Sequence, residues 1–539
     1  MVNPVFFPWQ AAMGLMTGQG AAIQQNFMRA WQDLLRDARR GTLKPPADRR
    51  FSSAAWAASP QALFTAHAYL ITAEALKEMA EAARLDDAAR ERLQFAIMQW
   101  VEAASPSNFL ATNPDAQKRL IDTRGESLQR GLANLMHDLQ RGRITQTDEH
   151  AFQPGVNLAI TPGGVVYENA LMQVIQYSPQ VERTHRIPLL MVPPCINKYY
   201  ILDLQPANSV VAHALQAGFD IFMVSWRNPR PDDVDGTDTR TWDDYLEQGV
   251  LQAMQVVSKI TRQRKINVLG FCVGGTMLAS ALAVARARGG DPVASLTLLT
   301  TLLDFGNAGI LDVFVDELHA RARERQLGQG GLMTAAELST TFSFLRPSEL
   351  VWNYVEANYL KGESPRAFDL LSWNADGTNL PGPFFAWYFR NMYLENRLVT
   401  GQLESCGVAM DLQALDMPAY IYASRDDHIV PWASAYASTQ LLAGPLRFVL
   451  GESGHIAGVV NPPERGKRGY WSAGPQHLPP DPEGWLEGST HAGGSWWPDW
   501  LQWLEAHSGP LRAARKTLGN KSFPVIEPAP GRYVKVKAV

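Results

Sequence analysis

The chain has 539 residues, enough for several domains and a large buried core. Hydrophobic residues make up 46% and charged residues 19%, a composition that excludes a disordered chain. The net charge of −4 is too balanced for nucleic acid to be the main partner. Three cysteines cannot form a disulfide framework, so we expect a reducing, cytoplasmic setting.

The first 28 residues carry no charge, and Arg29 is the first charged residue. A secretory signal needs a basic start, and a membrane span needs about 20 mostly apolar residues. Prolines and amides such as Pro8 and Gln10 interrupt this stretch. We therefore expect no transmembrane segment here. The stretch is either a loosely packed terminus or a segment that rests on an apolar surface.

Residues from about 20 to 142 show helical patterns. Ser59 and Pro60 resemble an N-cap followed by a proline at the first helical position. Four apolar residues further on recur at helical spacing and are expected on one face: Leu93, Ile97, Trp100 and Val101. No titratable cluster with catalytic spacing occurs in this region. We expect residues 1–150 to form a helical domain for contacts, not for chemistry.

From about residue 151, short apolar runs alternate with helical stretches such as Trp242 to about Thr261. The runs are 165–167, 187–192, 221–224, 266–269, 296–303, 420–422 and 447–450. This alternation predicts an α/β domain over residues 151–539, with a mostly parallel sheet covered on both faces. Residues from about 305 to 410 interrupt the alternation with amphipathic and aromatic stretches. An insertion of that length is expected to form a lid or cap.

The most informative motif is Gly270-Phe-Cys272-Val-Gly274, between an apolar strand and a helix of small residues. It is the nucleophile elbow of the α/β-hydrolase fold, with Cys272 in place of the usual serine. The sharp turn strains the nucleophile's backbone, and side chains at the flanking glycines would clash with neighbouring elements. The helix N-terminus favours a thiolate, and the N–H of Val273 can hold an oxyanion.

Two other cysteines compete for the role of nucleophile. Cys195 follows a predicted strand, in the loop that supplies the second oxyanion donor in this fold. We expect that donor from residues 194–197, with Ile196 as the candidate, and a packing role for Cys195. Cys406 lies among polar residues without an elbow, so we interpret it as structural.

In this fold the acid and then the histidine follow the nucleophile along the chain. Asp427 follows the strand at 420–422, and His455 follows the strand at 447–450. Functional groups gather beyond the carboxyl ends of such strands. We therefore predict His455 as the general base and Asp427 as the acid that orients it. His428 competes as the base but is poorly placed to bond its neighbour Asp427, so it is expected beside the site.

The acid has two further candidates. Asp304 ends the strand at 296–303, an alternative acid position in this fold, and Asp426 directly precedes Asp427. An aspartate that does not serve as the acid would be a loop cap or turn residue. The basic tail at 511–539 carries seven Lys or Arg side chains and one acid. It either attracts anionic ligands or packs as a charged terminal segment.

These residues closely resemble the class I polyhydroxyalkanoate synthases, enzymes that polymerise (R)-3-hydroxyacyl-CoA into storage polyester. The resemblance extends from about residue 100 to the end, and the residues before it match only in being helical. The matching stretches are 270–276 (GFCVGGT), 193–198 (PPCINK), 200–205 (YILDLQ), 224–229 (VSWRNP), 298–305 (LLTTLLDF), 426–432 (DDHIVPW), 454–459 (GHIAGV) and 530–534 (PGRYV).

The resemblance implies the same triad of Cys272, Asp427 and His455, with Asn197 beside the site. It places Arg346 near the phosphates of CoA, although a surface arginine at a helix start fits that position equally well. It also implies a homodimer, a cap over the active site, and a cytoplasmic location on storage granules with granule-associated proteins. Without a zinc-ligand cluster or Walker loop, the chemistry is expected to need no cofactor or metal.

A cysteine suits this reaction because its acyl-enzyme is a thioester, close in energy to acyl-CoA. Transfer of the acyl group to a hydroxyl then forms a more stable oxoester. We expect the substrate to be short, 3-hydroxybutyryl-CoA or a close relative. The alternatives are a cysteine-dependent hydrolase, either an acyl-CoA thioesterase or an intracellular polyester depolymerase, and a non-catalytic granule protein.

Overall fold

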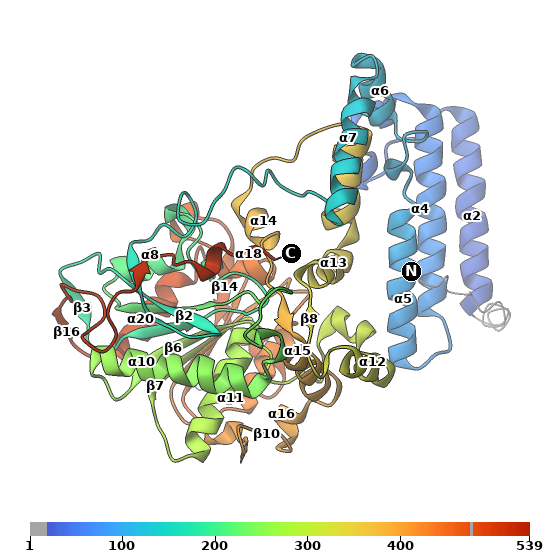
Figure 1. Ribbon diagram of the computed structural model, residues 1–539. Coiled ribbons are helices and arrows are strands. Elements are labelled where there is room, and N and C mark those ends of the chain that lie inside the picture. The colour runs from blue at the N-terminus through green and yellow to red at the C-terminus, as the bar shows by residue number, and fades with distance from the viewer. Residues whose placement is uncertain (1–18, 475–477, 539) are drawn as a thin grey trace. The chain divides into compact units, whose positions relative to one another are not determined.

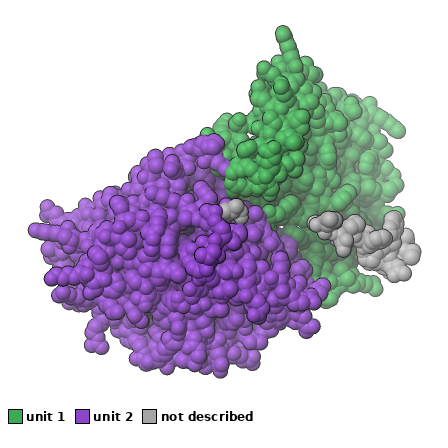
Figure 2. All heavy atoms as spheres, in the orientation of Figure 1, with its two compact units in different colours: residues 1–148, 340–366 green, residues 149–339, 367–539 purple. Residues whose placement is uncertain are grey.

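The computed structural model describes residues 19–474 and 478–538. The chain divides into two compact units, shown in different colours in Figure 2. The first contains the chain up to Asp148 and also Thr340–Arg366, and the second contains Glu149–Ser339 and Ala367–Val539. The predicted cap, residues 305–410, is therefore divided between the two units, a difference from the predicted boundaries.

The second unit is built on an 11-stranded sheet (Figure 1). In spatial order its strands are β15 (Thr490–Gly493), β14 (Gly469–Ser472), β13 (Leu446–Gly451), β12 (Ala419–Ser424), β7 (Val293–Leu299), β6 (Ile266–Phe271), β4 (Leu189–Val192), β5 (Ile221–Trp226), β2 (Met172–Tyr177), β1 (Gly163–Glu168) and β17 (Glu527–Pro528). The centre, from β13 to β5, is parallel, and the strands outside it pair antiparallel.

The strands β4, β5, β6 and β12 are buried along their whole length, so both faces of the sheet are covered, as predicted. All seven predicted runs form strands. The sequence did not predict β2, β14, β15 or β17. These strands pair antiparallel outside the parallel centre, so they lack the continuous apolar pattern of a buried parallel strand, and Gln173 and Gln176 interrupt β2.

Helices flank the sheet between and after the strands. They are α8 (Val210–Gln216), α9 (Trp242–Asp244), η7 (Tyr245–Leu251), α10 (Gln252–Thr261), α11 (Val273–Ala287), α17 (Trp432–Ala437), α18 (His455–Val459), α19 (Pro482–Glu487) and α20 (Trp497–Ala506). The helix predicted from Trp242 is continuous, with one π-helical stretch at η7. The indole N–H groups of Trp496 and Trp497 donate to the carbonyls of Gly458 (3.1 Å) and Val459 (2.9 Å), which fastens α20 to α18.

The interrupting segment of the second unit is mostly helical. Its elements are η8 (Gly309–Phe314), α12 (Glu317–Leu327), β8 (Leu332–Met333), the start of α13 (Ala335–Leu345), α14 (Asp369–Asn374), β9 (Leu380–Pro381), α15 (Gly382–Tyr388), η11 (Phe389–Leu394) and α16 (Arg397–Thr400), followed by the hairpin of β10 (Glu404–Ser405) and β11 (Val408–Ala409). An aromatic cluster is its core. The ring of Trp242 stacks on Phe384, Trp387 and Tyr388 with centroids 5.1–5.5 Å apart.

The first unit is helical, as predicted (Figure 1). Its main helices are α2 (Gln19–Arg40), α3 (Ala54–Ala58), α4 (Pro60–Glu81), α5 (Asp87–Ala103), α6 (Pro114–Asp122) and α7 (Glu126–Arg141). Ser59 caps α4 by accepting the N–H of Ala62 (3.2 Å), as its sequence predicts. Ile97 and Val101 are buried, but Trp100 is 58% exposed. Its place on the buried face of α5 was therefore predicted wrongly.

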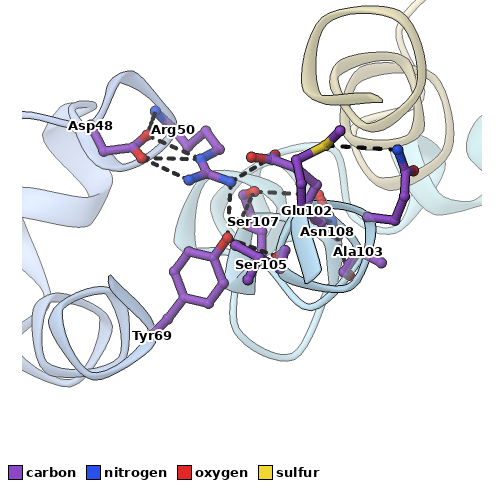
Figure 3. A network of polar contacts seen from close by, with 11 residues as sticks. Asp48, Arg50, Tyr69, Glu102, Ala103, Ser105, Ser107 and Asn108 are labelled. Carbon is purple, nitrogen blue, oxygen red and sulfur yellow. Dashed lines mark hydrogen bonds and ion pairs between the residues drawn. The ribbon is translucent and has the colours of Figure 1, made fainter. Parts of the chain in front are cut away.

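Arg50 lies at the centre of a polar network in the first unit (Figure 3). Its guanidinium donates to Asp48 (2.7 Å), to Glu102 (3.0 Å) and to the hydroxyl of Tyr69 (3.1 Å). Tyr69 in turn donates to the carbonyl of Val101 (2.8 Å). The network ties the segment before α3 to α4 and α5. Hydrogen bonds between charged partners are shorter and stronger than neutral ones, so this arginine fixes how the three segments meet.

Residues 340–366 belong to the first unit because they pack along α7. This segment contains the end of α13, η9 (Ser348–Trp352) and η10 (Val355–Leu360). Asn134 donates to the carbonyls of Asn358 (3.0 Å) and Glu363 (3.1 Å), and the Tyr359 hydroxyl donates to Asp138 (2.6 Å). These partners lie more than 200 residues apart in the sequence, which is why no local pattern predicted the contact.

The uncharged stretch predicted at the N-terminus lies mainly outside the described residues, which begin within it at Gln19. Among the helices that the structure describes, none combines the length and the apolar character needed to cross a bilayer.

Candidate active site

Cys272 lies in the turn between β6 and α11, at the carboxyl edge of the sheet. Its φ of +53° is in the left-handed region, where a residue other than glycine is strained. The turn is held by its backbone: Cys272 N–H donates to the carbonyl of Leu299 (2.9 Å), and Cys272 C=O accepts the N–H of Gly275 (2.8 Å). The Thr301 hydroxyl also donates to that carbonyl (3.2 Å). The strained elbow expected from the motif is therefore present.

The glycines of the elbow are required by close backbone approach. A Cβ on Gly270 would lie 2.4 Å from the Cα of Gly275. A Cβ on Gly274 would lie 2.3 Å from the carbonyl oxygen of Val192, at the end of β4. Distances this short are not tolerated between backbone atoms, so both positions exclude any side chain. The approach packs the start of α11 against the loop that follows β4.

His455 and Asp427 meet at the carboxyl ends of β13 and β12, which β7 separates from β6 in the sheet. His455 is the first residue of α18, after β13, and its Nδ1–H donates to Asp427 Oδ2 over 2.6 Å. Asp427 follows β12, and its Oδ1 accepts the N–H groups of Ile429 (2.8 Å) and Val430 (2.9 Å). Both side chains are almost completely buried. Asp427 is thus fixed by two backbone donors and in turn fixes the imidazole.

The electrostatics of His455 favour its charged form. Burial lowers the pKa of His455, but the charges of Asp427 and Cys272 and its hydrogen bonds to both side chains outweigh burial and raise the pKa. The ring also lies over Phe271, with centroids 5.6 Å apart and planes 24° from parallel. The imidazole is therefore held between the carboxylate and the sulfur, where an imidazolium can stabilise a thiolate.

The competing acids lie elsewhere. Asp304 Oδ1 accepts the side-chain amide of Asn396 (2.7 Å) and the N–H of Gly306 (2.8 Å). It therefore stabilises the loop at the start of residues 305–410, the predicted cap. Asp426 is exposed in the turn after β12. His428 directly follows Asp427 and is half-buried. The structure brings Asp427, and neither of the other two aspartates, into hydrogen-bond contact with His455.

Two backbone N–H groups are candidates for an oxyanion hole. Val273 is the first residue of α11, so its N–H has no intrahelical acceptor. Ile196 lies in the loop after β4, and its carbonyl accepts the N–H of Thr378 (2.9 Å). In the chain as far as it is described, neither N–H donates to a backbone carbonyl. The neighbouring Asn197 forms a bridge with Gly377, which ties this loop to the cap region.

The other two cysteines have environments unlike that of Cys272. Burial raises the pKa of the Cys195 thiol, and the nearby charge of Cys272 raises it further, so Cys195 stays protonated. Burial also raises the pKa of Cys406, with the charges of Asp243 and Glu247, to about 12. Neither environment favours a thiolate.

Sequence reasoning missed two tyrosines within residues 305–410, the predicted cap, that lie close to Cys272. Burial raises the pKa values of Tyr388 and Tyr393, and the negative charge of Cys272 contributes to both shifts. Their rings pack edge to face, 5.5 Å apart, and both contact Phe305. The aromatic composition of the insertion was the available signal, but it did not single out these two residues.

Arg346 lies in the first unit, where it pairs with Glu349 over 3.4 Å and is partly exposed. Its expected role near CoA therefore stays a prediction. Within the described ranges, no group of three His, Cys, Asp or Glu side chains could hold a metal ion. Four of the seven basic side chains of the tail form ion pairs. Arg512 and Arg515 approach Asp220 (3.5 and 3.4 Å), and Lys537 approaches Asp376 (3.1 Å). Arg532 pairs with Glu168 and Glu527.

Comparison with known proteins adds two family matches. The model for the poly-beta-hydroxybutyrate polymerase (PhaC) N-terminus matches residues 47–214, and the model for the alpha/beta hydrolase fold matches residues 188–462. A monoacylglycerol lipase from Paleococcus ferrophilus is similar over 62% of this chain and 99% of its own, at 13% identity and a TM-score of 0.37. The first match begins well before residue 100, so the resemblance reaches further towards the N-terminus than predicted.

Two relatives match almost the whole chain. The poly(3-hydroxyalkanoate) polymerase subunit PhaC of Cupriavidus necator is 54% identical over 98% of this chain and 90% of its own. The poly(3-hydroxyalkanoate) polymerase of Methylorubrum extorquens is 39% identical over 92% and 82%. The chain therefore belongs to the poly(3-hydroxyalkanoate) polymerase family, the one that its motifs resemble, and is an acyltransferase with the α/β-hydrolase fold.

Proposed function

We propose that this enzyme polymerises short (R)-3-hydroxyacyl-CoA, in particular 3-hydroxybutyryl-CoA, through a thioester on Cys272. The observation that carries the proposal is the arrangement of a cysteine at a strained elbow beside a histidine whose Nδ1–H is bonded to a buried aspartate. The names of the relatives support the polyester product, and the poly-beta-hydroxybutyrate description of the matching family supports a short acyl group.

In the first step the Cys272 thiolate attacks the thioester carbonyl of the substrate. His455 carries the proton taken from the thiol, and Asp427 stabilises the imidazolium. The N–H groups of Val273 and Ile196 hold the tetrahedral oxyanion, and its collapse expels the sulfur of CoA, which takes the proton from His455 and leaves as a thiol. One thioester replaces another, so the acyl group is loaded without a large change in free energy.

In the second step the 3-hydroxyl group of an acyl chain attacks the Cys272 thioester. His455 accepts the hydroxyl proton, and Cys272 leaves as the thiolate. The product is an oxoester, more stable than the thioester, and this difference drives elongation. Water must be kept out because it would hydrolyse the same intermediate. We propose that residues 305–410, the predicted cap, exclude water from the site, and the buried aromatic cluster with Tyr388 and Tyr393 supports this proposal.

The proposal includes partners beyond the substrate. Because the product is a water-insoluble polyester, we propose that the enzyme acts as a homodimer at the surface of a storage granule with other granule proteins. An apolar face on α7 supports contact with such a surface. It consists of Leu128, Leu132, Met136 and Leu139, which are 45–65% exposed and follow one another at helical spacing.

Release of free CoA from (R)-3-hydroxybutyryl-CoA, measured together with turbidity, tests the proposed reaction. We expect both signals to rise together as polymer forms. CoA release with free 3-hydroxybutyrate as the main product would show a hydrolase instead. Longer acyl-CoA substrates measured in parallel test the preference for short chains, which would be wrong if they reacted faster.

A further inference from the structure

The C-terminal tail reaches the loop that carries the proposed oxyanion donor Ile196. The carbonyl oxygen of Val536 accepts a hydrogen bond from Lys198 Nζ (2.7 Å) and a second from Asn228 Nδ2 (3.2 Å). Lys198 lies two residues after Ile196 and is only 2% exposed. Three chain segments far apart in the sequence therefore meet at one carbonyl group.

The same contacts close a ring around the loop. Asn228 Oδ1 accepts the N–H of Asn379 (3.0 Å), and the neighbouring Thr378 donates its N–H to the carbonyl of Ile196 (2.9 Å). Trp373 Nε1 donates to the carbonyl of Lys198 (2.7 Å). The backbone of residues 196–198 is thus held by the tail on one side and by the cap region on the other.

The lysine is costly to bury, so its position needs an explanation. Burial lowers the pKa of Lys198 to about 8, although the charge of Asp376 opposes this shift. Asp376 is itself shared with the hydroxyl of Tyr200 (2.8 Å) and with Lys537 (3.1 Å). An apolar side chain would pack at this position without a desolvation penalty. A cation here is useful if its hydrogen bond fixes the backbone beside it.

We propose that Lys198 and the carbonyl of Val536 form a clamp that holds the Ile196 N–H in position to bind the oxyanion. Lys198 is then a positioning residue, and the last residues of the chain contribute to the rate of acyl transfer. The inference rests on the proposed function, because it needs Ile196 as an oxyanion donor. Loss of a whole oxyanion donor typically costs about 10²–10³ in rate, so a displaced donor is expected to cost about 10- to 100-fold.

Two truncated chains separate the clamp from other effects of the tail. A chain that ends at Val536 keeps an oxygen acceptor for Lys198, now as a terminal carboxylate, and loses Lys537. A chain that ends at Lys535 loses the acceptor as well. We expect the first to keep its kcat within about twofold, because Lys537 is 69% exposed, and its buried partner Asp376 still accepts the hydroxyl of Tyr200 and lies near the charge of Lys198. We expect the second to lose kcat by the 10- to 100-fold given above, with little change in KM.

The variant Lys198→Met removes the other half of the clamp. Its kcat should fall as much as that of the chain ending at Lys535, and the two changes together should cost no more than either alone. Lys198→Arg keeps a donor and should retain more activity than Lys198→Met.

Alkylation of Cys272 by iodoacetamide distinguishes positioning from general damage, because this displacement forms no oxyanion. Variants that break the clamp should keep the wild-type alkylation rate while CoA release falls. A parallel fall in alkylation and CoA release would overturn the clamp, as would equal kcat values for the two truncated chains. If the wild-type enzyme failed to transfer acyl groups from (R)-3-hydroxybutyryl-CoA, the proposed function would be wrong. The clamp is tested separately, by the differences between the variants and the wild type.

Discussion

The proposed catalytic centre of the second unit and the helix pair of the first unit, formed by α7 and residues 340–366, are assembled in different ways. Cys272, Asp427 and His455 follow three strands at one edge of the same sheet, so the order of the strands brings them together. In the first unit, α7 is joined to residues 340–366 by side chains that donate to backbone carbonyls. The position of a site at the carboxyl ends of parallel strands is determined by the order of the strands. The position of a helix pair of this kind is determined by individual polar contacts.

The largest expected effect is the loss of CoA release on substitution of His455, which tests the site at the carboxyl ends of the strands. His455→Gln should lower CoA release by several orders of magnitude because the proton acceptor is lost, whereas His428→Gln should change it far less. The pH dependence of iodoacetamide alkylation provides a second measurement. Because the pKa of His455 is raised, its imidazolium persists above neutral pH, so alkylation of the wild-type enzyme should vary little from pH 7 to pH 9.

In His455→Gln the thiolate loses its counter-ion, so alkylation should become slower at neutral pH and increase with pH. The reverse result, a larger loss of activity in His428→Gln, would exchange the roles of the two histidines.

Substitution of Asp427 tests which of the aspartates that follow the strands serves as the acid. Asp427→Asn keeps the shape of the side chain but removes the charge that stabilises the imidazolium, so we expect kcat to fall by about 10³- to 10⁴-fold. Asp304→Asn is the matched control, because Asp304 bonds Asn396 and Gly306 instead of the histidine. Steady-state CoA release measures both variants. Equal losses would contradict the assignment of Asp427.

Gly131 tests how closely α7 and residues 340–366 depend on each other. A Cβ at this position would lie 1.9 Å from the carbonyl oxygen of Tyr359, so Gly131→Ala must push the segment away from the helix. We expect it to lower the free energy of unfolding of the first unit by about 2 kcal/mol, measured by denaturant unfolding. Gly493→Ala is the control, because no atom lies within 4 Å of its added Cβ. An unchanged or higher stability of Gly131→Ala would show that the two segments are not in close contact.

The smallest effect concerns a single hydrogen bond in the first unit. Tyr359→Phe removes the bond to Asp138 (2.6 Å), and a bond to a charged acceptor contributes about 1.5 kcal/mol. Tyr354→Phe lies in the same segment and is the control, since the pKa of Tyr354 is raised by burial alone. Denaturant unfolding should separate the two variants. Equal stabilities would mean that the contact with Asp138 contributes nothing.

The sequence predicted the parts of the molecule that depend on local patterns. The buried parallel strands, the elbow glycines and the order of Cys272, Asp427 and His455 follow from apolar runs and short motifs, and the structure confirms the strands and the elbow. Asp304 could not be dismissed in advance, because its bond to Asn396 joins residues 92 positions apart. Contacts between residues far apart in the sequence also place residues 340–366 in the first unit, which no local pattern predicts. The exposure of Trp100 shows that helical spacing alone does not determine which residues are buried.

The most direct test of the central proposal is mass spectrometry of the enzyme quenched shortly after mixing with (R)-3-hydroxybutyryl-CoA. The proposed mechanism predicts a hydroxybutyryl group, or a short oligomer of it, on the peptide that contains Cys272, and no such label in Cys272→Ala. A label on Cys195 or Cys406, or continued CoA release by Cys272→Ala without any label, would contradict it.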